Sequence, residues 1–278
     1  MTDESQHKKF RGGSSKAVAF WIGGSAAVLA AVVYVMLTIA PQMLAVFLPE
    51  KWTKDAGAKM EASFVHHRPA CSNALGKQAL AALLQRLRET ATQLPPVQVN
   101  VYNDPVVAAF TFPGGHIMLT RALIQSADTA DEVAAVLAHE YGHAFHRDSE
   151  AQLVRITGLQ ILLGAASGGS SSGTAGSLTS TAAIMQSSRQ AERDADAFAV
   201  KLLTAARIDP VALKTFLKKL LADESRRGVG GPSTFNDIFS THPGTEERIK
   251  RVAPETKVEN PQSALNADRW QDLRKICG

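Results

Sequence analysis

The clearest hydrophobic pattern is an uncharged, apolar stretch near the N-terminus. No charged side chain occurs in Ala17–Ala40, and about 20 apolar residues are enough for a helix to cross a hydrocarbon core. Trp21 and Tyr34 lie near its ends, as interfacial aromatic residues do. A cleaved signal peptide is the alternative, but the run exceeds the usual apolar signal core of about 7–15 residues. We therefore expect residues 17–40 to be an uncleaved anchor in a lipid bilayer.

Charge on the two sides of this stretch predicts its orientation. Basic residues precede it, whereas basic and acidic residues nearly cancel after it. Because positive residues favour the cytoplasmic side, we expect residues 1–16 to form a cytoplasmic tail and the remainder of the chain to face outward. The basic residues that precede the span are Lys8, Lys9, Arg11 and Lys16.

Helical and strand-like patterns follow a juxtamembrane linker that we place at residues 41–57. Apolar residues recur at helical spacing between Asn73 and Leu94, up to two prolines. Short β-prone runs then alternate with turn residues. We expect these runs to form a small antiparallel sheet inside one domain of residues 58–278. The expected strands are Val97–Tyr102, Val106–Phe112 and His116–Thr120.

A helix with a strong start signal follows the predicted strands. Thr129 and Glu132 have the spacing of a capping box, which satisfies backbone amides at the start of a helix. Further helical patterns run from about Ser187 to Ala206 and, after Asp209-Pro210, to Ala222. The expected fold class is therefore α+β and mostly helical, with the sheet packed beside the helix that starts at Thr129.

Composition narrows the class of protein. The chain has 278 residues, of which 45% are hydrophobic, and a formal net charge of +4, so it can bury one sizeable core. Its basic residues gather in the N-terminal tail or alternate with acidic ones, and no nucleic-acid-binding motif is present, so we expect no nucleic-acid partner. Cys71 and Cys277 match no zinc or redox spacing. They could pair outside the cytoplasm or stay as buried thiols.

The helix that starts at Thr129 carries the sequence His-Glu-Tyr-Gly-His. His139 and His143 are four residues apart and share a helix face, so both imidazoles can bind one Zn²⁺ ion. Glu140 is next to the first ligand, where it can act as a general base on a water molecule. A third histidine at the metzincin position is excluded, because Ser149 occupies it and His146 reads as a surface residue.

A third ligand comes from a later helix in this interpretation. Glu192 and Asp196 lie four residues apart on one face. Catalytic zinc usually has three protein ligands, and a carboxylate commonly orients one of its histidines. We therefore assign Glu192 as ligand and Asp196 as the residue that supports the ligands; an ordinary charged helix face is the alternative.

Four motifs in this order resemble the HtpX and CAAX prenyl protease family of zinc metallopeptidases, peptidase family M48. The resemblance covers roughly residues 97–250 and implies a gluzincin-type fold. It also implies one zinc ion held by His139, His143 and Glu192. His242 would then lie near the cleft, where it stabilises the transition state or caps the zinc. The single predicted span is more similar to the single-pass branch than to the multi-span prenyl proteases. The matching segments are Ala109–Ile117, Leu137–His143, Ser188–Asp196, Ser240–Pro243 and Glu247–Ile249.

The resemblance implies a metalloendopeptidase that acts on extended or misfolded polypeptides, in envelope quality control at the periplasmic face of a bacterial inner membrane. We expect substrate to add as a strand to His116–Thr120, with Gly114, Gly115, His116 and Ile117 in contact with it. His116 by itself is more often a solvent-facing strand residue than a catalytic one. The resemblance is imperfect at Ala108 and Ala122, where close relatives carry Asn and Gly.

Two other functions remain open from the residues alone. One is a chaperone-like binding module in which zinc only braces the fold, and the other is a membrane-anchored scaffold without metal. The apolar residues 156–163 and the Gly- and Ser-rich residues 164–180 lie between the two metal-binding helices. They could form a mobile lid or a plain surface helix and loop.

Overall fold

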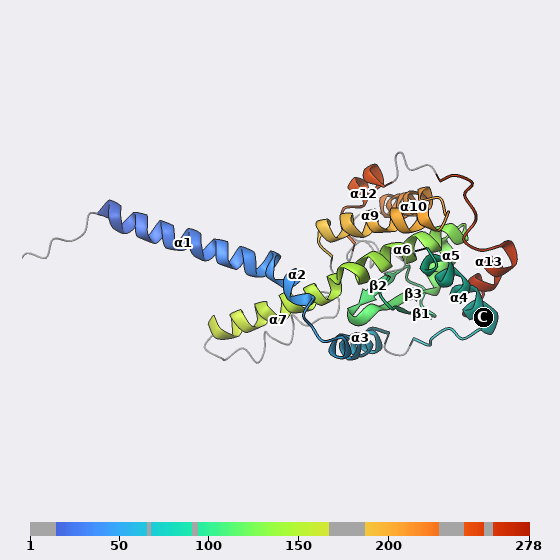
Figure 1. The fold of residues 1–278 in the computed structure, drawn as a ribbon, viewed down its shortest axis with the longest axis horizontal. Coiled ribbons are helices and arrows are strands. Elements are labelled where there is room, and N and C mark those ends of the chain that lie inside the picture. The colour runs from blue at the N-terminus through green and yellow to red at the C-terminus, as the bar shows by residue number, and fades with distance from the viewer. Residues whose placement is uncertain (1–14, 66–67, 91–93, 167–186, 228–241, 253–257) are drawn as a thin grey trace, which may run out of the picture.

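The computed structural model describes residues 15–65, 68–90, 94–166, 187–227, 242–252 and 258–278. Helices dominate, and a small sheet lies against the central helix α6 (Figure 1). The helices are α1 (Ser15–Thr38), α2 (Ala40–Ala45), α3 (Glu50–Val65), α4 (Ala74–Arg88), α5 (Arg121–Ser126), α6 (Ala130–His146), α7 (Asp148–Ala166), α9 (Arg189–Ala205), α10 (Val211–Arg227), α12 (Thr245–Arg251) and α13 (Ala267–Arg274), with a 3₁₀ turn η1 (Pro113–Gly115).

The sheet is mixed, whereas we expected an antiparallel sheet from the sequence. Its strands β1 (Gln98–Tyr102), β2 (Ala109–Phe112) and β3 (His116–Thr120) are ordered β1-β3-β2. β2 and β3 form an antiparallel hairpin across η1, but β1 pairs with β3 in parallel. Residues 103–108 carry the chain from one edge of the sheet to the other, which leaves room for β3 between its neighbours.

Helix α6 is the core of the domain because nearly all of its residues are buried. The predicted helix start is confirmed: the Thr129 side chain accepts the Glu132 N–H as in a capping box, whereas the Glu132 carboxylate accepts the N–H of Asp128, one residue before the N-cap. α9 crosses α6 at Gly142, where an added Cβ would lie 2.8 Å from the Cα of Ala195. Glycine therefore lets the two helices approach closely enough to share a site.

Helix α3 packs against the far side of the sheet. An added Cβ on Gly57 would lie 1.9 Å from the carbonyl oxygen of Pro113, so this helix lies directly on η1. Glu61 of α3 is buried and binds the Nδ1 atom of His116 at 3.0 Å. The expected linker of residues 41–57 thus contains α2 and the first half of a helix that is part of the domain.

Helix α1 projects away from the globular part, and α2 at its base lies beside α7 (Figure 1). Within the described residues one helical stretch, Ala19–Ala45, is long and apolar enough to cross a membrane. Its large apolar side chains are exposed, Phe20 and Trp21 among them. Length and composition therefore agree with the expected span.

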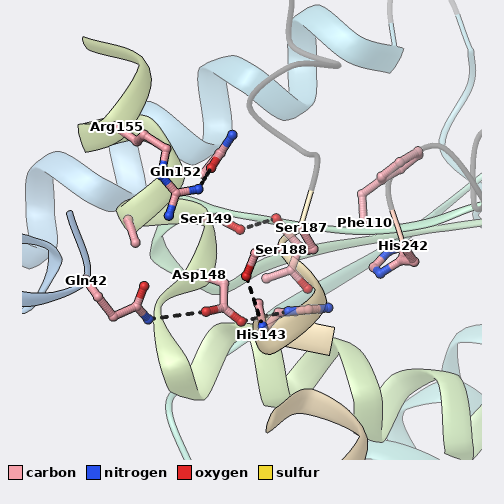
Figure 2. Close-up of a pocket in the computed structure, with 13 residues that line it drawn as sticks. Gln42, Phe110, His143, Asp148, Ser149, Gln152, Arg155, Ser187, Ser188 and His242 are labelled. Atoms are coloured by element: carbon pink, nitrogen blue, oxygen red, sulfur yellow. Dashed lines mark hydrogen bonds and ion pairs between the residues drawn. The ribbon is translucent and has the colours of Figure 1, made fainter. Parts of the chain in front are cut away.

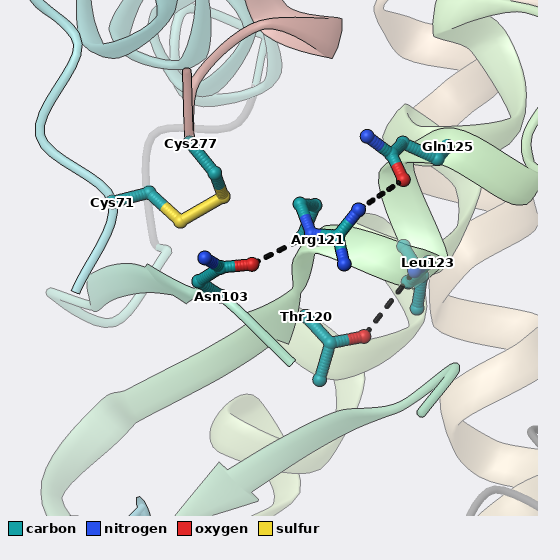
Figure 3. The surroundings of a disulfide bond; sticks show 7 residues. All are labelled: Cys71, Asn103, Thr120, Arg121, Leu123, Gln125 and Cys277. Carbon is teal, nitrogen blue, oxygen red and sulfur yellow. Dashed lines mark hydrogen bonds between the residues drawn. A yellow bond between two sulfur atoms is a disulfide. The ribbon is translucent and has the colours of Figure 1, made fainter. Parts of the chain in front are cut away.

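Cys71 and Cys277 form a disulfide bond (Figure 3). It joins the segment before α4 to the C-terminal end of the chain, after α13. The backbone reinforces this junction, because the Asn73 N–H donates to the Ile276 carbonyl at 3.1 Å and the Cys71 N–H donates to Val101 at 2.8 Å. Of the two states that the sequence left open, the paired one is observed.

Candidate metal centre

Helix α6 places His139 and His143 on one face, as the four-residue spacing predicts. Their Nε2 atoms lie 3.1 Å apart, and both side chains are buried. Two imidazole nitrogens this close can bind one shared cation. Glu140 is also buried, one residue after the first histidine.

Glu192 enters from the first turn of α9. Its carboxylate oxygens lie 3.4 Å from His139 Nε2 and 3.5 Å from His143 Nε2. Ligands at about 2.05 Å from a tetrahedral zinc ion are separated by about 3.3 Å. The three residues therefore come together at the spacing that a zinc ion requires.

A fourth candidate ligand atom belongs to His242, which precedes α12. Its Nδ1 lies 3.1 Å from Glu192 Oε1 and 3.5 Å from His139 Nε2. Ligand atoms from all four residues lie within 4.8 Å of one another. On its other side, Nε2 of His242 faces Glu140 Oε1 at 3.7 Å. His242 thus contacts both the metal-binding group and the candidate base.

The Nδ1 atoms of both α6 histidines contact carboxylates. Asp196 Oδ1 lies 2.9 Å from His139 Nδ1, as expected for a residue that orients a ligand. Asp148 Oδ2 lies 2.8 Å from His143 Nδ1 (Figure 2), a contact that the sequence interpretation missed. Such partners fix the tautomer and leave Nε2 free for the metal.

Arg248 of α12 is a second residue that the sequence interpretation missed, although it lies in a quoted motif. Its guanidinium is buried and binds Asp196 through two nitrogens, at 2.8 and 2.7 Å. A third nitrogen binds Glu192 Oε2 at 2.8 Å. One guanidinium therefore fixes the positions of both carboxylates, that of the ligand Glu192 and that of Asp196. The planar fork of arginine is suited to this geometry.

The charges of the cluster shift its pKa values. Burial alone would raise the pKa of Glu192, but the nearby His242 and Arg248 hold it well below its ordinary value. Arg248 and His139 outweigh burial at Asp196 too, and lower its pKa to about 2. Burial tends to lower the pKa of His143, but hydrogen bonds to Asp148 and Glu192 raise it well above 6.5. In the metal-free chain the imidazoles therefore take up protons that a metal ion would displace.

Thr111 of β2 orients Glu140. Its hydroxyl donates to Glu140 Oε2 at 2.6 Å, and its backbone carbonyl accepts a hydrogen bond from Ser149. Since Oε2 is engaged by Thr111, Oε1 is the oxygen that faces His242. Glu140 therefore presents one defined oxygen to the site.

Strand addition to β3, by which we expected substrate to contact Gly114, Gly115, His116 and Ile117, is excluded. β3 is the central strand and is already paired on both edges, so no chain can add to it. The two glycines have positive φ and fit against backbone of their own chain, at Lys54 and Pro96 respectively.

His116 is buried and does not face solvent, and its ring nitrogen Nδ1 contacts Glu61. The other oxygen of Glu61 accepts hydrogen bonds from Asn100 at 2.8 Å and Tyr102 at 3.1 Å. Burial, together with the charge of Glu61, raises the pKa of Tyr102 to about 12. This buried group fastens α3 to β1 and β3 on the side of the sheet away from α6.

His146 lies outside the metal-binding group, half-buried at the end of α6, in agreement with its assignment as a surface residue. The lid that the sequence left open begins at residue 156. Helix α7 extends through Ala166, so the apolar part and the first residues of the predicted loop are helical. The remainder of that loop lies outside the described residues.

Comparisons with known proteins agree with this geometry. A family model described as Peptidase family M48 matches residues 74–256. The mitochondrial metalloendopeptidase OMA1 of Schizosaccharomyces pombe is 29% identical over 184 residues, which cover 64% of this chain and 53% of that protein. The β-barrel assembly-enhancing protease of Escherichia coli K12 is 31% identical over 194 residues, 65% of this chain and 39% of that protein. The matched part thus spans about half or less of these relatives.

Proposed function

The chain belongs to peptidase family M48, and on this premise we propose that it is a zinc-dependent endopeptidase that hydrolyses extended or misfolded polypeptides. One observation carries the proposal: His139, His143 and Glu192, from two helices far apart in sequence, converge beside the buried carboxylate of Glu140. A base beside a three-ligand zinc site is the arrangement of hydrolytic metal enzymes.

His139, His143 and Glu192 would hold the ion, with Asp196, Asp148 and Arg248 fixing their orientation. A zinc ion held there would supply Lewis acidity, which would polarise a substrate carbonyl and make a water molecule more acidic, with a pKa of about 7. The donor set fits, because two neutral nitrogens and one carboxylate oxygen are ligands that zinc prefers. No second group of this kind occurs among the described residues.

Glu140 acts as the general base. Thr111 holds one carboxylate oxygen by a hydrogen bond of 2.6 Å, so the other accepts the proton of the attacking water and then donates it to the leaving amine. A buried base that is held in one orientation pays no reorganisation cost during the reaction.

Edge strand β2, and not β3, is the strand that an extended substrate can join. Among the described residues β2 pairs with β3 on one edge only, and the Thr111 side chain joins this strand to Glu140. Thr111 lines one cavity and Ala109 lines another, and His242 contributes to the lining of both. A substrate along β2 would therefore pass directly over the metal site, held by main-chain hydrogen bonds.

His242 stands where it can serve either the metal or the reacting oxygen. We assign it a catalytic role, since its Nε2 faces Glu140 while its Nδ1 faces Glu192. His242→Ala should retain zinc through the three remaining ligands and lower kcat more than it changes KM. Loss of the metal instead would make His242 a ligand and not a catalytic residue.

The fourth candidate ligand, His242, also favours a second candidate function. A closed set of four ligands is typical of structural zinc, and His242 can complete such a set. In that case the chain is a zinc-braced, chaperone-like binding module. Glu140 has no role in such a module, so its substitution would leave the function unchanged.

Residues 17–40 form the proposed membrane anchor, with residues 1–16 in the cytoplasm and the peptidase domain outside. The apolar stretch Ala19–Ala45 supports the anchor, and the name of the E. coli relative supports a role in the cell envelope, where quality control of misfolded proteins is our proposed task. The peptidase domain begins before α3 in this proposal, because α3 packs on η1 and on His116.

The experiment is cleavage of casein, as an unfolded protein, by the purified full-length chain in detergent. We expect zinc-dependent cleavage that a chelator abolishes and that added zinc restores. Glu140→Gln should keep its zinc and lose roughly 10²–10⁴-fold in rate. A Glu140→Gln protein that cleaves like the unaltered chain would refute the mechanism.

A further inference from the structure

Helix α2, at the base of the apolar span, is hydrogen-bonded to the turn that follows the metal-binding helix. The side-chain amide of Gln42 donates to the His146 carbonyl at 2.9 Å and to Asp148 Oδ1 at 3.3 Å. A carboxamide nitrogen has two hydrogens, so it can serve both acceptors. The contact spans more than one hundred residues of sequence.

This turn carries a group on which the metal site depends. Asp148 accepts from Gln42 through Oδ1 and binds His143 Nδ1 through Oδ2 (Figure 2). Both carboxylate oxygens are therefore committed, one toward α2 and one toward the ligand. The chain of contacts runs from Gln42 through Asp148 to His143, whose Nε2 faces the other ligands.

A second set of contacts joins the same turn to the segment that follows α2. Arg147, between α6 and α7, has φ of 56°, and its guanidinium donates to the carbonyls of Val46 at 3.1 Å and Leu48 at 3.4 Å. These carbonyls belong to the segment that joins α2 to α3. On α2 itself, Pro41 and Ala45 are buried, and the helix packs on α7.

From this arrangement we propose that Gln42 is a positioning residue of the metal centre and that α2 is part of its support. Gln42 restrains the Asp148 carboxylate, which in turn fixes the tautomer and direction of His143. The inference rests on the proposed zinc site and goes beyond it, because it makes metal affinity depend on the helix at the base of the span. Residues outside the peptidase motifs thus take part in the site.

The test is a double-mutant cycle on zinc affinity, measured on the full-length chain in detergent by competition with a chromophoric chelator. Asp148→Ala should weaken zinc binding roughly 10- to 100-fold, as loss of a ligand's supporting carboxylate does. Gln42→Met, which keeps the length of the side chain without a donor, should weaken it roughly 2- to 10-fold. In the Asp148→Ala background the same change should have less than about a twofold effect, because coupled residues are not additive.

Two further variants separate positioning from general damage to the helix. Gln42→Lys retains a donor that can reach both acceptors and should keep the affinity of the unaltered chain. Met43→Ala changes an exposed residue of the same helix and should also leave affinity unchanged. Thermal unfolding of each metal-free variant shows whether it is folded.

The possible results are distinct. Unaltered zinc affinity in Gln42→Met, or equal effects of that change with and without Asp148, overturns the inference and leaves the proposed function intact. A full-length chain that binds no zinc overturns both. Loss of affinity in Gln42→Met, with retention in Gln42→Lys, supports a direct role for the donor.

Discussion

Arg248 binds Glu192 at 2.8 Å through one nitrogen while its other nitrogens hold Asp196. The buried guanidinium thus restrains one oxygen of the carboxylate that we assign as the third metal ligand. It also offsets part of the negative charge that two buried acids bring to the site. A single ammonium group in the same position would supply the charge, but it could not hold both carboxylates with the three-nitrogen geometry of the guanidinium.

Arg248→Lys should therefore lower zinc affinity roughly 10- to 100-fold, although the charge is kept. Chelator competition measures the affinity. Arg251→Lys is the matched control, because Arg251 lies on the same helix with its side chain 58% exposed and forms a surface ion pair with Glu247. Equal affinities in the two variants would show that Arg248 does not position the ligand.

Gly142→Ala should separate α6 from α9. The new methyl group would lie 2.8 Å from the Cα and 3.1 Å from the Cβ of Ala195, so the helices must move apart or strain. We expect a loss of roughly 1–3 kcal/mol in unfolding free energy and weaker zinc binding, since Glu192 is on the displaced helix. Denaturant unfolding and metal content measure the two effects.

The control for this change is Gly158→Ala in α7. Apart from the backbone of its own helix, no atom of the described residues lies within 4 Å of its added Cβ, and alanine is the better helix former by about 1 kcal/mol. Gly158→Ala should therefore keep or raise stability. If Gly142→Ala behaves in the same way, close packing at that position is not required.

Reduction of the Cys71–Cys277 disulfide should destabilise the domain. The bond closes a long loop, with a sequence separation of 206 residues, and loss of a native disulfide typically costs roughly 2–5 kcal/mol. The Cys71→Ser, Cys277→Ser double variant should unfold at lower denaturant concentration than the oxidised chain and should not respond to reductant. Identical unfolding curves for the oxidised and reduced protein would contradict this prediction.

The metal-free chain should be most stable between about pH 4 and pH 6.5. Since the pKa values of His139 and His143 are raised above 6.5, their contribution is full below that pH and is lost as the pH rises through the raised values. The pKa of Asp196 is lowered from 3.8 to about 2, so its contribution is lost as the pH falls across that interval. Thermal unfolding of chelator-treated protein across this pH range checks both limits; a melting temperature that rises above pH 6.5 would contradict the first.

Local spacing was sufficient to predict part of the site. His139, Glu140 and His143 follow from helix periodicity, and the carboxylate pair Glu192 and Asp196 follows from the same rule with the family resemblance. Thr111, Asp148 and Arg248 were missed because their roles come from packing between distant segments. Asp148 had one signal, its place five residues after His143 at the start of a new helix, which could have suggested a carboxylate near the ligand.

Strand positions were predictable from β-prone runs and turn residues, but strand order was not. Short connections on both sides of β2 favoured a simple antiparallel meander. The chain instead crosses the sheet at residues 103–108, and β3 fills the gap. This difference moves the unpaired edge from β3 to β2, and for that reason the expected strand addition beside Gly114 and His116 is excluded.

The bond between Cys71 and Cys277 has a practical consequence for any experiment that looks for cleavage of this chain, including cleavage by itself. Every peptide bond of the metal-binding helices lies inside the covalent ring that it closes. A single cut anywhere in that ring leaves one molecule of unchanged mass apart from an added water. Self-cleavage would thus escape notice on a gel without reductant, and the fragments would separate only after the sulfur bridge is opened.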